Sequence, residues 1–133
     1  MKYMVLMYAD PAATEAMTAE ERAEVFRRHD RLHEDLAGTG EMLNGAGLAL
    51  PRDTMTIRGH GDGARPATTP GPLSTATEQV TAYYVVDCAS PERALEIAGR
   101  VVDFHVVAVE VRPVHDAFGM EGGRPDDTPA RQE

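Results

Sequence analysis

The segment that decides the fold reads VTAYYVVDCASPERALEIAGRVV over residues 80–102. β-Branched and aromatic residues dominate its beginning, which predicts a strand over Val80–Asp87. Ser90 is a favourable N-cap, and Pro91 suits the first helical position, where no amide hydrogen is needed, so we expect a helix to begin here. This helix should end near Val101. Its buried side would carry Leu95, Ala98, Val101 and Val102.

The start of the chain has the same order of a strand followed by a helix. Residues 1–9 are apolar on both faces of a strand, and Asp10-Pro11 ends it. Thr18 and Glu21 match a capping box, in which each side chain accepts a hydrogen bond from the amide of the other residue. We expect a helix from Thr18 to Ala37, stopped by the two glycines that follow. Its apolar stripe contains Val25, His29, Leu32 and Leu36.

The remaining segments complete the fold. Residues 41–50 and 53–60 predict two short strands, residues 61–63 a turn, residues 64–74 a loop or irregular extended edge, and residues 105–114 the last strand. The order β-α-β-β-loop-β-α-β predicts an α+β ferredoxin-like sandwich, with an antiparallel sheet covered by helices on one face. Residues 1–118 would form this domain. Residues 119–133 lack apolar periodicity, which predicts a disordered C-terminal tail.

The uncovered face of that sheet indicates a homodimer. The strands predicted at residues 1–9, 80–87 and 105–114 are apolar on both faces. A monomer seldom exposes so large an apolar area to water. Two sheets that pack face to face would cover it, and we therefore expect two copies of the chain to associate in this way.

Composition narrows the classes of function. Asp and Glu number 22 and Lys and Arg 13 in 133 residues, so the formal net charge is −9, which argues against nucleic acid as the partner. The single cysteine, Cys88, excludes a disulfide framework and a multi-cysteine zinc site. No apolar run is long enough for a membrane span, and residues 4–9 lack the features of a signal peptide. We expect a cytoplasmic protein without a cofactor.

Several segments, in this order along the chain, resemble the YCII-related family, in particular its branch with an Asp-Gly-Pro-Phe motif. They are MKYMVLMY (1–8), MLNGAGL (42–48), PGPL (70–73), EQVTAYY (78–84), SPERALE (90–96) and VEVRPV (109–114). The resemblance implies a dimeric α/β barrel and a function that is poorly defined across the family. Some relatives look like small-molecule enzymes that use a His–Asp pair in a cleft near the barrel.

The motif that names this branch is altered here. Pro70 and Leu73 stand where the branch has Asp and Phe, and Thr75 and Thr77 stand where it usually has Glu and Lys. Three ionisable groups are therefore missing from one loop. Their loss favours a binding protein over an enzyme whose activity depends on that loop.

His29 is the leading catalytic candidate. It lies in the apolar stripe of the first helix, and the resemblance places it where enzyme-like relatives have their catalytic histidine. An imidazole in a partly apolar cleft can act as a general acid or base near neutral pH. Asp10, at the end of the first strand, is the candidate carboxylate that orients it. The alternatives are a structural or dimer-contact role for His29 and an ordinary turn role for Asp10 before Pro11.

Three further residues are candidates for ligand binding. Glu110 and Arg112 share one face of the last strand, where Arg112 can hold a carboxylate or phenolate. The alternative for this pair is a salt bridge within the dimer interface. Tyr83 and Tyr84 face opposite ways, one toward the core and the other toward an interface or cleft, and we include Tyr84 among the ligand-binding candidates.

A metal site is not favoured by the histidine pattern. His29 and His33 are four residues apart and could chelate from one helix face, but His60, His105 and His115 lie far apart in the sequence. We expect a protein that binds a small organic ligand in a cleft of the dimeric barrel. The alternative is a small-molecule enzyme that transfers protons, in the manner of a lyase, with His29 as general acid and base.

Overall fold

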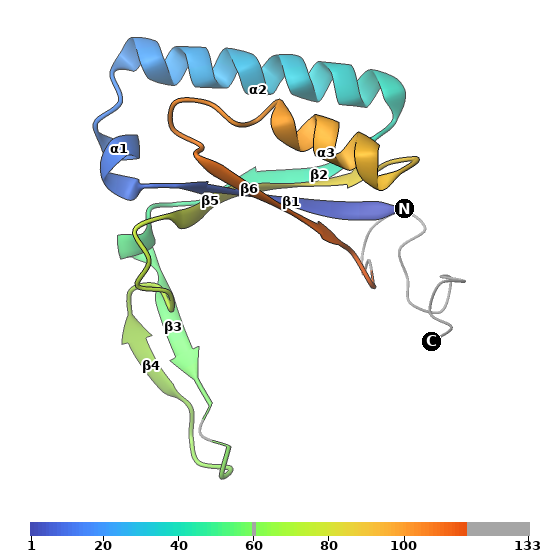
Figure 1. The fold of residues 1–133 in the computed structure, drawn as a ribbon. Helices are drawn as coiled ribbons and strands as arrows, with labels where there is room; N and C mark the ends of the chain where they lie inside the picture. The colour runs from blue at the N-terminus through green and yellow to red at the C-terminus, as the bar shows by residue number, and fades with distance from the viewer. Residues whose placement is uncertain (60, 117–133) are drawn as a thin grey trace.

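The computed structural model describes residues 1–59 and 61–116, and the predicted tail at residues 119–133 lies outside this part. Its main sheet is antiparallel and has the strand order β2-β5-β1-β6 (Figure 1). The strands are β1 (Lys2–Ala9), β2 (Met42–Gly47), β5 (Gln79–Asp87) and β6 (Ala108–Pro113). Helices α2 (Ala19–Thr39) and α3 (Pro91–Gly99) cover one face of it. This α+β arrangement with an antiparallel sheet agrees with the predicted ferredoxin-like class.

Helix α2 begins and ends where its caps predict. The Thr18 side-chain oxygen accepts the Glu21 amide at 3.1 Å, and the Glu21 carboxylate accepts the Thr18 amide at 2.9 Å, so the predicted capping box is confirmed. The helix runs to Thr39, two residues beyond the predicted end, and Gly40 stops it with a left-handed φ of 78°. Its buried residues Val25, Leu32 and Leu36 belong to the predicted apolar stripe.

Helix α3 begins at the predicted cap, but its buried side is rotated from the prediction. The Ser90 hydroxyl accepts the Arg93 amide at 3.2 Å. The buried residues of the helix are Ala94, Ile97 and Ala98, at helical spacing, and Val101, just beyond its end, is also buried. Leu95 is 61% exposed and Val102 45% exposed, so their predicted burial is wrong. The buried side of the helix thus carries the small residues Ala94 and Ala98, and Leu95 lies outside it.

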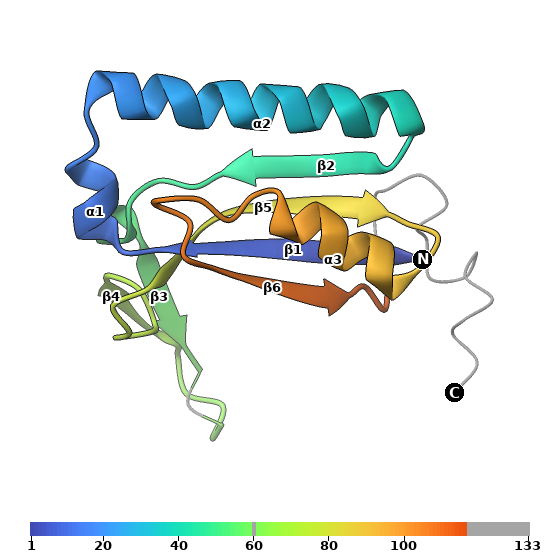
Figure 2. The ribbon, with the colours of Figure 1, turned by 45° about the horizontal axis from the view of Figure 1, so that its top comes forward.

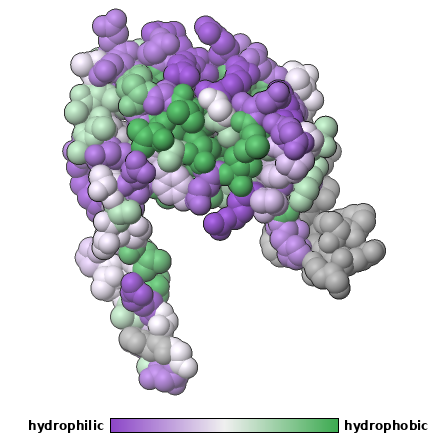
Figure 3. Space-filling view, viewed as in Figure 1, coloured by the Kyte–Doolittle hydropathy of each residue, from purple (hydrophilic) through white to green (hydrophobic). Residues whose placement is uncertain are grey.

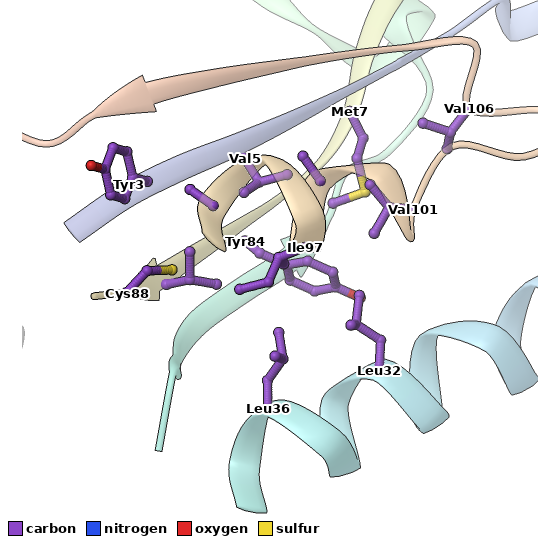
Figure 4. Packing of buried hydrophobic residues seen from close by; sticks show 13 residues of the cluster. Tyr3, Val5, Met7, Leu32, Leu36, Tyr84, Cys88, Ile97, Val101 and Val106 are labelled. Carbon is purple, nitrogen blue, oxygen red and sulfur yellow. The ribbon is translucent and has the colours of Figure 1, made fainter. Parts of the chain in front are cut away.

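The register of β1 separates the two faces of the sheet. Tyr3, Val5 and Met7 are buried under the helices and alternate with the half-buried Met4, Leu6 and Tyr8 on the other face. Figure 4 shows this helix side of the sheet, where Val5 and Met7 pack with Leu32, Leu36 and Ile97. In Figure 2, α2 runs along the β2 side of the sheet and α3 lies over β1 and β6. The face away from the helices is the one that the sequence predicts to be uncovered.

Residues 51–70 depart from the sheet as a separate hairpin. The 3-10 turn η1 (Pro51–Asp53) leads into β3 (Met55–Arg58), which pairs antiparallel with β4 (Ala67–Pro70). The hairpin projects from the body of the protein, on the side of the sheet away from the helices (Figures 1 and 2). The strands predicted at residues 41–50 and 53–60 are therefore shorter than expected, and an extended edge within residues 64–74 is confirmed as β4.

Two other segments differ from their predictions. A short helix, α1 (Pro11–Glu15), follows β1 and was not expected. The last strand begins at Ala108 rather than at residue 105, because Asp103 turns the chain by accepting the amides of His105 and Val106 at 2.7 Å each. This turn leaves residues 105–107 free of the strand and directs His105 toward the space under α2.

Hydrophilic and hydrophobic side chains occupy different parts of the surface. Hydrophilic side chains cover the outer side of α2, and hydrophobic ones gather below it over α3 and the segment that leads into β6 (Figure 3).

An ion pair between Glu41 and Arg93 joins the start of β2 to α3. The Arg93 guanidinium donates two hydrogen bonds, of 2.8 and 2.9 Å, to the Glu41 carboxylate, and these bonds lower the pKa of Glu41 to about 2. No helix within residues 1–59 and 61–116 has the length and apolar character needed to cross a membrane.

Candidate functional site

A pocket of about 440 Å³ opens between helix α2, strand β2 and the turn before β6. Its apolar lining includes Met7, Met17, Val25, Phe26, Leu48 and Val106. Its polar lining includes Arg22, His29, His33, Thr81, Tyr84 and His105. The volume and the mixture of apolar walls with a few polar groups are typical of sites for small organic ligands.

Helix α2 supplies one wall of the pocket. The lining residues on this helix follow one another at helical spacing, which places them along one side of it: Arg22, then Val25 and Phe26 three and four residues on, then His29 and His33. His29 is half-buried between the buried Val25 and Leu32, in the stripe where the sequence predicts it. One helix therefore forms this wall of the pocket along its whole extent, from Arg22 to His33.

His29 and Tyr84 form the central polar contact of the pocket. His29 Nδ1 lies 2.6 Å from the Tyr84 hydroxyl, and the two rings meet edge to face. Figure 4 shows the Tyr84 side chain extending from the sheet toward α2 beside Leu32. Burial lowers the pKa of His29, because the imidazolium loses solvation, and raises the pKa of Tyr84, because the phenolate does. Both groups are thereby held in their neutral forms near neutral pH.

The position of Tyr84 depends on a glycine in the neighbouring strand. Gly45 of β2 is paired with Tyr84, and a Cβ atom at Gly45 would overlap Cδ1 of the tyrosine ring and lie 3.0 Å from the Tyr83 carbonyl oxygen. Gly47, two residues along the same strand, has open space at this position. The run of small residues from Gly45 to Gly47 lets the ring lie flat against β2 and leaves room for the pocket.

A second histidine lines the pocket and has its own carboxylate. His105 is 7% exposed, and its Nδ1 lies 3.2 Å from Asp103 Oδ1. Burial raises the pKa of Asp103, but the amides of Val106 and His105 outweigh this and hold the pKa of that carboxyl below its usual range. The Asp103 charge also acts on His29, where it opposes the effect of burial on the pKa. Asp103 therefore contacts His105 directly and acts on His29 through its charge.

The predicted pairing of Asp10 with His29 is not what the structure shows. The Asp10 carboxylate accepts the Ala12 amide at 3.0 Å and caps α1, since the chain folds into that short helix directly after β1. Asp10 instead lines a separate hollow together with Tyr8 and Glu110. The sequence predicted the pairing because the end of the first strand can lie near the first helix in this fold class.

The three ligand-binding candidates lie on opposite faces of the sheet. Tyr84 pairs with Val5 on the helix side, whereas Glu110 pairs with Leu6 and Arg112 with Met4 on the uncovered side. There Glu110 accepts a hydrogen bond of 2.5 Å from the Tyr8 hydroxyl, and this bond raises the pKa of Tyr8. Glu110 and Arg112 therefore belong to a different surface from the His29 pocket.

The altered family motif does not contribute to the pocket. Residues 70–77 are absent from the pocket lining within the described chain. Pro70 ends β4, and Gly71 follows with a φ of 95° at the base of the hairpin, where its amide donates to the Thr54 carbonyl. The loss of ionisable groups from that loop thus leaves the groups around His29 unchanged.

Neither a metal cluster nor a reactive thiol is apparent in the described residues. No group of three or more His, Cys, Asp or Glu side chains is placed there to hold a metal ion. His60, one of the histidines considered, lies outside the described residues. Cys88 is buried, and burial raises the pKa of its thiol, which disfavours the nucleophilic thiolate.

Sequence reasoning missed Arg22, Asp103 and His105 as parts of this site. The signal for Arg22 was its spacing of seven residues, two helical turns, from His29. The signal for Asp103 and His105 was an Asp followed two residues later by a His at the expected start of a strand. In this pattern the Asp side chain can also bond to nearby backbone amides and form a turn. Only the turn before β6 brings His105 under α2.

The fold and the pocket define an α+β protein of the ferredoxin-like class, with a histidine and a tyrosine joined inside an apolar site. The pattern of the YCII-related domain matches residues 1–117, and the chain belongs to this family. It is also 30% identical, over 116 residues, to an uncharacterized protein of Rhizobium meliloti (strain 1021); this match covers 86% of the chain and 92% of the relative.

The contact between Gly45 and Tyr84 gives a direct test of how the site is built. We expect Gly45→Ala to lower the free energy of unfolding by about 1–3 kcal/mol, because the added methyl group displaces the Tyr84 ring. Gly47→Ala, which meets open space on the same strand, should leave the stability unchanged or raise it by about 0.4–1 kcal/mol. Urea denaturation of both variants measures the difference. Equal stability of the two variants would contradict this account of the ring position.

Proposed function

We propose that this YCII-related protein binds a small, largely apolar organic molecule in the pocket beneath helix α2. The observation that carries the proposal is a hollow of about 440 Å³ in which apolar walls surround the hydrogen-bonded His29 and Tyr84. Such a site buries the body of a ligand and orients it through a few polar groups. A ligand would meet Val25 and Phe26 on one side and His29, Tyr84 and His105 at the inner end.

Binding to this pocket can be tested with a neutral aromatic probe and a variant that fills the space. When indole is added, the NMR signals of backbone amides that line the pocket should shift and reach saturation. Gly47→Leu should abolish these shifts, because the new side chain occupies the pocket without a backbone clash. Gly38→Leu is the matched control, since Gly38 also has open space but lies outside the pocket lining. Saturable shifts that persist in Gly47→Leu would place the ligand elsewhere.

A second function, proton transfer to and from the bound molecule, is favoured by the 2.6 Å contact between His29 and Tyr84. The tyrosine hydroxyl can donate to Nδ1 or accept from it. When it accepts, the His29 Nε2 lone pair is free to take a proton; when it donates, Nε2 carries a proton that it can give. Because burial lowers the pKa of His29, the imidazole is neutral near pH 7 and can act as the base.

Catalysis of this kind should appear as hydrogen exchange into a carbon acid. With 1-phenyl-2-propanone in D₂O, the protein should speed the replacement of the C–H hydrogens next to the carbonyl by deuterium. The rate should rise with pH and level off with a midpoint below the ordinary imidazole value of about 6.5, because only the neutral ring accepts a proton. His29→Gln should lose the effect while it still binds indole. Exchange no faster than in buffer would remove the catalytic function and leave the binding function standing.

The same proposal includes a homodimer that forms a dimeric α/β barrel through the uncovered face of the sheet. Leu6 pairs with Tyr83 and Met4 with Val85 across the strands of this face, so apolar side chains lie side by side on it. The β3–β4 hairpin projects on the same side and would flank a second copy. A buried, free Cys88 suits a reducing compartment, and we keep the cytoplasm as the proposed location.

A charge on the uncovered face should separate the two copies. The wild-type protein is expected to show the mass of two chains by light scattering after gel filtration. Leu6→Glu should show the mass of one, because the interface cannot solvate the buried carboxylate. Leu95→Glu, at an exposed position of α3, should remain a dimer. A wild-type mass of one chain at about 10 μM, a concentration well above the dissociation constant of a stable dimer, would overturn the dimer.

A further inference from the structure

We propose that the ligand is a small organic monoanion, whose carboxylate binds Arg22 at the mouth of the pocket and whose apolar body lies along Val25 and Phe26 toward His29. This inference rests on the proposed function, because it names the ligand class of the same pocket. It assigns to Arg22 the role of recognising the charge.

Arg22 brings an unpaired positive charge to the pocket. Within residues 1–59 and 61–116 it forms no ion pair, and its Nη2 donates to the carbonyl oxygens of Thr14 and Glu15 at 3.2 and 3.4 Å. These two bonds hold the guanidinium against the end of α1 without neutralising it. Its Nε and Nη1 hydrogens have no acceptor in that part of the chain, so they are available to a ligand carboxylate.

Four carboxylates lie within seven residues of Arg22 along the chain, and three of them are engaged by other groups. Glu15 pairs with Arg52, Glu24 pairs with Arg27, and Glu21 accepts the Thr18 amide in the capping box. No Asp or Glu of the described residues lines the pocket. A bound anion would therefore meet a cation at the mouth and no acidic group along the walls.

The rest of the pocket limits the ligand to a single charge. Arg22 is the one residue in the described lining that belongs to the Arg, Lys, Asp and Glu types. His29 and Tyr84 are held neutral by burial and offer hydrogen bonds rather than charge. A dianion such as a phosphate monoester would place its second charge in a protein of net charge −9, with no second Arg or Lys in the described lining to balance it.

The spacing along α2 sets the size of the ligand. Arg22 and His29 are seven residues apart, which corresponds to about 10 Å along the helix axis. Val25 and Phe26 lie between them on the same wall. A carboxylate joined to one aromatic or alicyclic ring has the length to reach from the guanidinium past these side chains toward the His29–Tyr84 pair.

Phenylacetate and its neutral amide, phenylacetamide, test this inference as a pair of equal size. Titration calorimetry at neutral pH should show that the wild-type protein binds the acid about tenfold more tightly than the amide. In Arg22→Gln the ratio of the two affinities should fall to about one, because phenylacetate binds more weakly while the affinity for phenylacetamide is unchanged. Arg22→Lys should retain a preference for the acid. Raising the salt from about 50 mM to about 500 mM should also reduce the wild-type ratio, since the charge lies at the mouth.

Arg28→Gln is the matched control for the change in charge. Arg28 is on the same helix and also donates through Nη2 to two carbonyl oxygens, those of Arg100 and Val102, at 3.4 Å each, but it does not line the pocket. Its replacement should leave the ratio of acid to amide binding at the wild-type value. An equal loss in Arg28→Gln would show that net charge, rather than Arg22, sets the preference, and would overturn the inference.

The remaining outcomes separate this inference from the function on which it rests. If indole binds the pocket but phenylacetate binds no more tightly than phenylacetamide, the ligand is not selected for its charge and the inference fails alone. If neither the acid, the amide nor indole binds, the pocket function and the inference fail together. If Arg22→Gln does not fold, the Arg22→Lys variant and the salt dependence of the wild type decide: a ratio that does not respond to salt overturns the role of Arg22.

Discussion

The alternation of side chains along β1 is the constraint on which the rest of the structure depends. This strand is hydrogen-bonded to β5 on one side and β6 on the other, so its register determines which residues of both neighbours face the helices. Val5 brings Tyr84 to the helix side, and Leu6 brings Glu110 to the other. A shift by one residue would exchange the two faces and remove Tyr84 from the pocket.

The pocket results from small residues at a place where the core is otherwise closely packed. Gly45 lets the Tyr84 ring lie against β2, and the space beside Gly47 stays open. On the opposite wall, His29 occupies a position in the apolar stripe of α2 and lines the hollow. Apolar packing is therefore incomplete at this point. The histidines there are hydrogen-bonded, His29 to Tyr84 and His105 to Asp103.

The candidate site was only partly predictable because its members come from segments that are far apart in the chain. His29 could be found from the helical stripe, and Tyr84 from the alternation of a strand, since both depend on local periodicity. Asp103 and His105 depend on a turn whose geometry follows from side-chain bonding to two backbone amides. Asp10 was paired with His29 because the end of the first strand can lie near the first helix in this fold class, but its carboxylate caps the short helix α1 instead.

Local sequence patterns were enough to predict the order of the main-sheet strands and the two longer helices, the N-caps of those helices, the antiparallel α+β class and the two-faced character of β1. These features rest on interactions between residues close in the chain: a capping box spans three residues, and strand alternation has a period of two. The tertiary structure decided which side of α3 is buried, where residues 51–70 leave the sheet, and which polar residues share a pocket. Those outcomes depend on packing between segments distant in the chain, such as Gly45 against Tyr84 and His29 near Asp103, and no local pattern specifies such contacts.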